Sequence, residues 1–407
     1  MNARSNPPPP DSLLTTLRSF PRPVWVLFAG VFLNKFGTFV LPFLAIYLTR
    51  RGFTNADAGI ALGSYGLGRI AAAFLGGYLA DRIGRRNTVL VSMTLTSASM
   101  LLLSQAETLP GIAALTALAS LTGEMYVPAC TALLTDLTSP AQRLTVFSTY
   151  RMAFNAGWAF GPAVAAFIAA HSFTWLFIGD AITSLLFAAI AWRWLPRAGT
   201  GLKEAGWTQA AITLGRDKHF QRIALATLFI GMCIHQMVST YGLHVTSLGF
   251  SDANYGMLLS FNGLLVLFCD LPLTRLTTRF PAPLMMALGY VLIGTGMMLN
   301  LVLRTLPGLF MGMLLFTLGE MIFAPVASAL VSKLAPANMR GRYMGGWAMF
   351  NSLAMFLAPN LGMKLYDHNS TLLWLFCGGC AGFAAITIIT SPRHREPSAV
   401  KTAAVAG

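Results

Sequence analysis

The chain has 407 residues, of which 55% are hydrophobic and only 10% are charged, and its formal net charge is +14. Soluble globular domains carry roughly a quarter charged residues, so the composition excludes an ordinary soluble protein. In a soluble protein, so large a positive charge would suggest a nucleic-acid partner. Here the Lys and Arg residues gather in alternate loops between apolar stretches, so we interpret the charge as membrane topology and expect no nucleic-acid partner.

Apolar stretches of about 20 residues, long enough to cross a bilayer as a helix, recur along the whole chain. They predict an all-α membrane protein with twelve transmembrane helices in two six-helix halves. The predicted spans are residues 23–48, 57–80, 88–105, 109–135, 144–170, 172–193, 220–247, 252–274, 284–303, 307–333, 343–366 and 370–391.

The predicted domain organisation follows from these spans. An N-terminal tail (1–22) precedes the first half (23–193), a central loop (194–219) leads to the second half (220–391), and a tail (392–407) follows. The central loop contains an amphipathic stretch, which we expect to lie as a helix on the inner membrane surface.

The distribution of positive charge predicts the orientation of the helices. Loops on one side carry most of the Lys and Arg residues, such as Arg82, Arg85 and Arg86, whereas the other side carries few, among them Arg50 and Arg51. The positive-inside rule places the first side, with both termini, in the cytoplasm. The polar, proline-rich N-terminus lacks the pattern of a cleavable signal peptide, so we expect a multi-pass protein of the plasma (inner) membrane.

An internal repeat relates the two halves. The segment GEMYVPACTALLTDLTSPAQR begins at Gly123 and the segment GEMIFAPVASALVSKLAPANMR begins at Gly319, an offset of 196 residues. The same offset carries Asn155 onto Asn351. We therefore expect a pseudo-two-fold axis along the membrane normal, with a substrate site near the midplane between the halves.

The loop after the second span carries the most specific motif, Gly77-Tyr78-Leu79-Ala80-Asp81-Arg82-Ile83-Gly84-Arg85-Arg86. A glycine at 77 allows helices to approach closely, Asp81 can pair with arginines or with a helix N-terminus, and Gly84 permits a tight turn. The motif resembles the G-x-L-A-D-R-x-G-R-R/K signature of the major facilitator superfamily at every defined position. That resemblance implies a gating latch between the halves in the outward-facing state, formed by Gly77, Asp81, Arg82, Gly84, Arg85 and Arg86.

A second motif lies in the fifth span, where Asn155, Gly157, Gly161 and Pro162 resemble a motif of the proton-coupled antiporters in that superfamily. The family form ends in two further glycines, where this chain has alanines. Drug antiporters of the family also often carry an arginine in the fourth span, at the position of Ala119. The alternative interpretation is packing of small residues beside a proline kink.

Ionisable side chains at membrane depth are the third group of candidates, because such groups are costly and usually functional. Glu124 and Glu320 are repeat mates, and each is followed by Met and, shortly after, by Pro. We expect them to carry protons or contact substrate; the alternative is a polar contact or ion pair between helices. The candidates for proton coupling or substrate contact are Lys35, Arg69, Glu124, Arg151, Asp180, His235 and Glu320, with Asp270 closer to the inner surface.

Metal, redox and enzymatic chemistry are not expected. His235 and His244 lack a third ligand, and Cys377-x-x-Cys380 lies in an apolar span without a nearby histidine, which favours packing. The chain has no phosphate-binding loop, so this chain alone cannot drive transport with ATP, and it carries no HExxH or nucleophile-elbow motif. We expect neither a cofactor nor a metal ion.

Residues 22–391 resemble the twelve-span drug:proton antiporters, in particular bacterial multidrug exporters whose first span ends in a pattern like that of residues 42–48. The resemblance implies alternating access, in which protons enter as small amphipathic molecules or drugs leave. The implied partners are the small-molecule substrate, protons and the lipid bilayer, and the implied functional unit is a monomer. Two alternatives stay open. One is a proton-coupled symporter or facilitator for a small solute, such as an anionic or zwitterionic one attracted by Lys35, Arg69 and Arg151. The other is a non-transporting membrane sensor.

Overall fold

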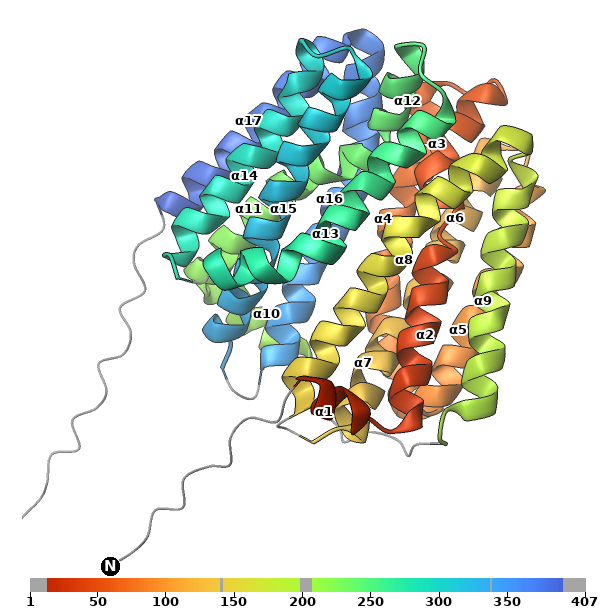
Figure 1. Ribbon diagram of the computed structural model, residues 1–407, viewed down its shortest axis with the longest axis vertical. Coiled ribbons are helices and arrows are strands. Elements are labelled where there is room, and N and C mark those ends of the chain that lie inside the picture. Colours follow the sequence, from red (N-terminus) through yellow and green to blue (C-terminus); the bar gives the residue numbers. More distant parts are fainter. Residues whose placement is uncertain (1–12, 140–141, 198–206, 278, 337–338, 391–407) are drawn as a thin grey trace, which may run out of the picture.

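The structure is a computed structural model that describes residues 13–139, 142–197, 207–277, 279–336 and 339–390. Within that part every regular element is a helix, and the long helices stand side by side in one bundle (Figure 1). The N-terminal helices are α1 (Leu13–Arg18), α2 (Arg22–Phe36), α3 (Val40–Arg50), α4 (Asn55–Arg82), α5 (Arg85–Ser104), α6 (Leu109–Glu124), α7 (Tyr126–Leu137), α8 (Arg143–His171) and α9 (Thr174–Trp194). The C-terminal helices are α10 (Trp207–Arg216), α11 (Lys218–Ile234), α12 (Thr240–Ser247), α13 (Asp252–Thr277), α14 (Ala282–Met298), α15 (Leu306–Leu334), α16 (Arg340–His368) and α17 (Ser370–Ile389).

The predicted all-helical membrane fold is confirmed. Of the described helical stretches, 11 are long and apolar enough to cross a membrane, and they correspond to every predicted span except 343–366. That span lies in α16, which has 29 residues but is more polar, with Asn351, Ser352 and Asn360 in its central part. The predicted count of twelve is therefore not confirmed by length and composition.

The repeat is visible in the way two helices begin. α6 and α15 each start after a threonine in the sequence Thr-Leu-Pro-Gly, and the hydroxyl oxygens of Thr108 and Thr305 accept a hydrogen bond from the N–H of the glycine three residues later. Such N-caps satisfy a backbone donor that the helix cannot, and proline in the first turn has no N–H to leave unpaired. The same local chemistry therefore starts the fourth and tenth spans.

Two matching interfaces join the N-terminal to the C-terminal helices. On α4, a Cβ at Gly59 or Gly66 would clash with the backbone of α16, and on α13 a Cβ at Gly256 or Gly263 would clash with α8. Each glycine on α13 lies 197 residues after its counterpart on α4. The repeat thus places the same close packing of small residues at both interfaces, as membrane helices require for close approach.

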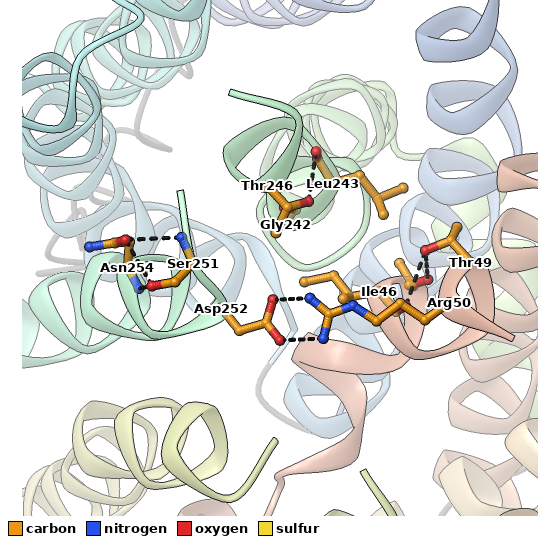
Figure 2. Close-up of polar contacts among 10 residues, drawn as sticks. Ile46, Thr49, Arg50, Gly242, Leu243, Thr246, Ser251, Asp252 and Asn254 are labelled. Atoms are coloured by element: carbon orange, nitrogen blue, oxygen red, sulfur yellow. Dashed lines mark hydrogen bonds and ion pairs between the residues drawn. The ribbon is translucent and has the colours of Figure 1, made fainter. Parts of the chain in front are cut away.

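The two groups of helices are also tied by charge at one end of the bundle, which we call the upper end because it lies uppermost in Figure 1. Arg50, the last residue of α3, donates hydrogen bonds of 2.7 and 2.8 Å to Asp252, the first residue of α13 (Figure 2). Each charge also suits its own helix, because cations stabilise a helix C-terminus and anions an N-terminus. At the same end, Asn55 of α4 donates to Asp367 of α16.

Three predicted spans are broken rather than continuous. The first breaks at residues 37–39 between α2 and α3, the fourth at Met125 between α6 and α7, and the seventh at the 3-10 helix η2 (His235–Val238) between α11 and α12. The fourth break has a cause in the sequence, since Pro128 has no N–H to offer the carbonyl of Glu124.

Side chains bond to backbone carbonyls at the other two breaks. At the seventh-span break, the buried amide of Gln236 donates to the carbonyl oxygens of Met232 (3.2 Å) and Ala358 (2.8 Å). At the first-span break, the hydroxyl of Thr38 donates to the carbonyl of Asn34 (3.0 Å). These bonds offset the loss of helical bonds at membrane depth, where no bulk water is available.

One expectation for the motif after the second span is wrong. A Cβ on Gly77 would meet nothing within 4 Å, so this glycine makes no close helix contact. The neighbouring Gly76 does so instead, against the backbone of Met125. Adjacent helical residues point about 100° apart, so a motif fixes the turn of helix but not the face. Gly84 behaves as expected, with a positive φ of 88° at the turn into α5.

Candidate functional site

An ion pair between Lys35 and Glu124 lies among the N-terminal helices. Lys35, near the end of α2, is only 7% exposed, and its Nζ lies 3.0 Å from Oε1 of Glu124 at the end of α6. The rings of Phe154 and Tyr126 lie 5.0 and 6.0 Å from the ammonium and add cation–π contacts. Gly157 permits this enclosure, because a Cβ there would lie 2.8 Å from the Cβ of Lys35. A glycine of the antiporter-like motif thus packs α8 against the end of α2.

The other residues of that motif also serve packing. A Cβ on Gly161 would lie 2.6 Å from the carbonyl oxygen of Phe36, and the carbonyl of Pro162 lies against Gly256 of α13. The side chain of Asn155 makes no hydrogen bond within the described part of the chain. The motif therefore brings α8 close to α2 on one side and to α13 on the other.

Asp180 of α9 lies at the break in the first span. Its carboxyl group is buried beside the backbone N–H groups of Phe39 and Val40, at the start of α3, and within electrostatic range of Lys35. A helix N-terminus carries partial positive charge, so an acidic side chain is stabilising there. Its Oδ2 has no hydrogen-bond partner among the described residues. This position suits a group that stabilises the broken helix.

Glu320, the repeat mate of Glu124, has a different environment. It accepts a hydrogen bond of 3.0 Å from the amide of Asn262 in α13, and the same amide donates to Oγ1 of Thr317 at 2.9 Å. Among the described residues, no Lys, Arg or His nitrogen lies within 4 Å of it, and the nearby charge of Asp270 is of the same sign. The repeat thus carries two carboxyl groups, one neutralised by a cation and one held by a neutral amide.

Arg151 and Asp270 form a separate ion pair. Nη2 of Arg151 in α8 lies 2.9 Å from Oδ2 of Asp270 in α13, so the pair joins the N-terminal to the C-terminal helices. Arg151 therefore neutralises Asp270 and does not pair with Glu124. Because Asp270 lies near Glu320, this ion pair belongs to the surroundings of the second carboxyl group.

Arg69 and His235 lie where the two groups of helices meet. Arg69 is midway along α4, and its Nη1 lies 3.8 Å from Sδ of Met355 in α16. One turn from Met355, the side-chain oxygen of Asn351 lies 3.2 Å from Nε2 of His235. The charge of Arg69 reaches both His235 and Glu124. The structure thus brings Lys35, Arg69, Glu124 and His235 into one region.

The charged residues of the gating motif find partners within the N-terminal helices. Arg85 forms an ion pair with Asp136 of α7 and donates to the carbonyl of Ala132 at 2.9 Å. Asp81 lies within electrostatic range of Arg85. Arg82 donates a hydrogen bond to the Tyr78 hydroxyl, and Arg86 donates one to the carbonyl of Trp192.

Several residues of the site are not predicted from the sequence. Asn351 could be found from the repeat, because it is the mate of a motif residue. Tyr65, one turn before Arg69, lies beside Glu124 but carries no charge that would single it out. Asn262 and Thr317 are likewise uncharged, and amide and hydroxyl side chains are common in membrane helices.

No metal or redox centre emerges in the described ranges, where no three His, Cys, Asp or Glu side chains are grouped as metal ligands. The five cysteines are free thiols, and Cys377 and Cys380 are buried in α17. His244 packs its ring 4.9 Å from that of Trp374.

Comparison with known proteins gives the family. The sequence profile of the Major Facilitator Superfamily matches residues 27–359 and, in a second match, residues 223–406. A Na(+), Li(+), K(+)/H(+) antiporter from Planococcus maritimus is 26% identical over 364 residues, which are 81% of this chain and 85% of the relative. The multidrug resistance protein MdtH of Aeromonas hydrophila is 27% identical over 397 residues, which are 92% of this chain and 96% of the relative.

Solved structures give the same fold. The nucleoside transporter NupG has a TM-score of 0.77 at 15% identity, and the match covers 90% of this chain and 98% of that one. The profile match spans most of the helical bundle, and the relatives it agrees with are transporters rather than enzymes. The chain therefore belongs to the Major Facilitator Superfamily and is a multi-span membrane transporter.

Proposed function

We propose that this transporter exports small amphipathic molecules in exchange for protons, by alternating access, and that Glu320 binds and releases the proton. The observation that carries the proposal is the unequal environment of the two carboxyl groups that the repeat makes equivalent. Glu124 has an ammonium at 3.0 Å, whereas Glu320 has a neutral amide at 3.0 Å.

The consequence for proton binding follows from the cost of charge at membrane depth, which is high unless a partner compensates it. A proton on Glu320 removes a charge that no cation offsets within the described residues. A proton on Glu124 would instead leave the ammonium of Lys35 unpaired in a buried position. The expectation that Glu124 and Glu320 carry protons or contact substrate is thereby narrowed to proton binding by Glu320. The Lys35–Glu124 pair stays neutral throughout the cycle.

Contacts between the two groups of helices support alternating access. With the orientation expected from the positive charges, the upper end faces the outside and the Arg50–Asp252 pair helps to close it. The gating motif then lies at the cytoplasmic end, where Arg85 pairs with Asp136 of the same group of helices. This arrangement suits a latch that is not engaged while the outer end is closed.

Export is favoured over import by the antiporter and the multidrug resistance protein among the relatives. A proton-coupled symporter for a small anionic or zwitterionic solute is the second candidate. It is favoured by Arg69, a cation at membrane depth that has no carboxylate within 4 Å in the described ranges.

Transport into proteoliposomes under an imposed pH gradient tests the proposal. The probes are the amphipathic dyes rhodamine 123 and rhodamine 110, the membrane potential is held at zero, and protein-free liposomes correct for passive uptake. An exchanger accumulates dye when the interior is the acidic side. Accumulation with the exterior acidic would establish symport, and uptake that ignores the gradient would remove proton coupling from the account.

A further inference from the structure

Arg69 occupies a position from which it can serve a ligand between the two groups of helices. It is the fifteenth residue of the 28-residue α4, and its guanidinium touches Met355 of the opposite group. Its side chain is partly exposed, as are those of Tyr65, His235 and Asn351 around it. These side chains come from both groups of helices, so the accessible surface lies between them rather than on a lipid-facing side.

The charges at this depth leave Arg69 in an unusual state. Three of the described cations at membrane depth are Lys35, Arg69 and Arg151. Lys35 has Glu124 at 3.0 Å and Arg151 has Asp270 at 2.9 Å. Arg69 has no carboxylate within 4 Å among the described residues, and the one whose charge reaches it, Glu124, is held by Lys35. A guanidinium at membrane depth without an anion is costly, and such groups usually serve a substrate or an ion.

The hydrogen-bonding capacity of Arg69 is also largely unused. A guanidinium has five N–H donors, and among the described residues Arg69 has one acceptor, the thioether sulfur of Met355 at 3.8 Å, which is a weak one. The planar fork of a guanidinium matches the two oxygens of a carboxylate, phosphate or sulfonate. Tyr65, His235 and Asn351 can supply further polar contacts, while Met355 offers an adaptable apolar surface.

We propose that Arg69 binds an acidic group of the substrate, so that the preferred cargo is an amphipathic carboxylate or zwitterion rather than a purely cationic amphiphile. This assignment rests on the proposed transport function and names the substrate class of the same site. The competing role for Arg69 is to balance the charge of Glu124 without touching a ligand.

Matched acid and ester probes separate the two roles. Rhodamine 110 carries a free carboxyl group and rhodamine 123 is its methyl ester; naproxen and its methyl ester form a second pair on an unrelated scaffold. Binding of all four is measured on the full-length protein in lipid nanodiscs, with empty nanodiscs subtracted. We expect each acid to bind about tenfold more tightly than its ester, the range for one charge-assisted bidentate contact.

Substitutions of Arg69 distinguish substrate binding from charge balance. Arg69→Gln should reduce the acid-to-ester preference to within about twofold of unity, and Arg69→Lys should keep part of it, because a lysine retains the charge but loses the fork. Arg304→Gln, in the exposed turn before α15, is the matched control and should keep the full preference. A role in charge balance alone would change folding or affinity for acid and ester alike, without changing their ratio.

Two results would overturn the proposal. In the first, neither acid binds more tightly than its ester, which includes the case in which none of the four probes binds. In the second, the preference for acid over ester persists in Arg69→Gln. Both leave the transport function separately testable. If one of these two results is found but rhodamine 123 is still exchanged for protons, proton-coupled export stands and the acidic-group site falls. If acids are preferred but the pH gradient has no effect, the site stands and the exchange mechanism falls.

Discussion

Breaking the Arg50–Asp252 pair should open the upper end of the transporter. The bond is bidentate, with N···O distances of 2.7 and 2.8 Å, and the exposed fractions of its side chains are 51% for Arg50 and 7% for Asp252. Exposed ion pairs contribute about 0–1 kcal/mol, whereas charge-assisted forked bonds to a sheltered carboxylate contribute more. We therefore assign about 1–2 kcal/mol to the pair in the closed state.

That free energy sets the size of the expected change. Both charges become hydrated when the end opens, so the pair stabilises the closed state alone. A change of about 1.4 kcal/mol alters an equilibrium constant tenfold. Asp252→Asn should therefore raise the ratio of open to closed molecules roughly tenfold. Arg50→Gln should act in the same direction and at least as strongly, because it leaves the carboxylate of Asp252, which is only 7% exposed, without its cation in the closed state.

Pulsed electron–electron resonance distances between spin labels at Glu107 and His368 report this opening. Both residues are exposed, near the upper end, and on opposite groups of helices. Cys269, the one exposed thiol, is replaced by serine beforehand. The variants should move population from the shorter to the longer distance. Arg51→Gln is the matched control, because within the described ranges the adjacent Arg51 donates only to groups of the N-terminal helices, such as the carbonyl of Ala106.

The reversed pair Arg50→Asp with Asp252→Arg gives a further check. It should restore part of the closed population, since the ion pair is remade. Unchanged distances in Asp252→Asn, or an equal change in Arg51→Gln, would refute the role given to this contact.

Three further predictions concern packing, pairing and backbone conformation. Gly66→Ala forces a methyl group against the backbone of α16 and should lower the free energy of unfolding by about 1–3 kcal/mol in thermal unfolding. Gly77→Ala, whose added Cβ meets nothing within 4 Å, should change that free energy by less than about 0.5 kcal/mol. Equal effects of the two substitutions would contradict the packing described. Arg151→Gln and Asp270→Asn should each lower the unfolding temperature, because each breaks the ion pair. The double variant should recover part of the loss, with a coupling free energy of about 1 kcal/mol between the two sites. Strictly additive effects of the two substitutions on stability would mean that the pair contributes nothing. Gly84→Ala should cost about 1–2 kcal/mol, because φ is +88° there, and an unchanged unfolding temperature would show that the turn relaxes freely.

The parts of the fold that the sequence predicts are those governed by composition and repetition. Hydrophobic length is enough to find eleven of the twelve predicted spans, and the repeat of Gly123 at Gly319 is enough to pair the glutamates. The repeat cannot distinguish the roles of the two glutamates, because the difference lies in partners from other helices. These partners are Lys35 for Glu124 and Asn262 for Glu320. Those partners depend on how helices pack, and the repeat does not conserve them.

Contacts between residues that are far apart in the sequence could not be predicted either. Arg50 and Asp252 are separated by 202 residues and lie at helix ends that look like ordinary loop boundaries in the sequence. The break at η2 carries no proline, so no such signal marks it, whereas Pro42, which has no N–H to offer the carbonyl of Thr38, marks the break at residues 37–39 in the sequence. The error at Gly77 has the same origin, since the helix face that a residue presents depends on its neighbours in space.

The most direct test of the account compares proton movement in two variants that each remove one repeat-mate glutamate. Glu320→Gln removes the proposed proton carrier, while Lys35→Met combined with Glu124→Gln removes the neutral ion pair without leaving a buried charge unpaired. Proton release from acid-loaded proteoliposomes is followed with an internal pH dye after dye substrate is added outside. The account predicts that release is lost in Glu320→Gln and persists in the double variant. Release that persists in Glu320→Gln, or that is lost only in the double variant, would contradict it.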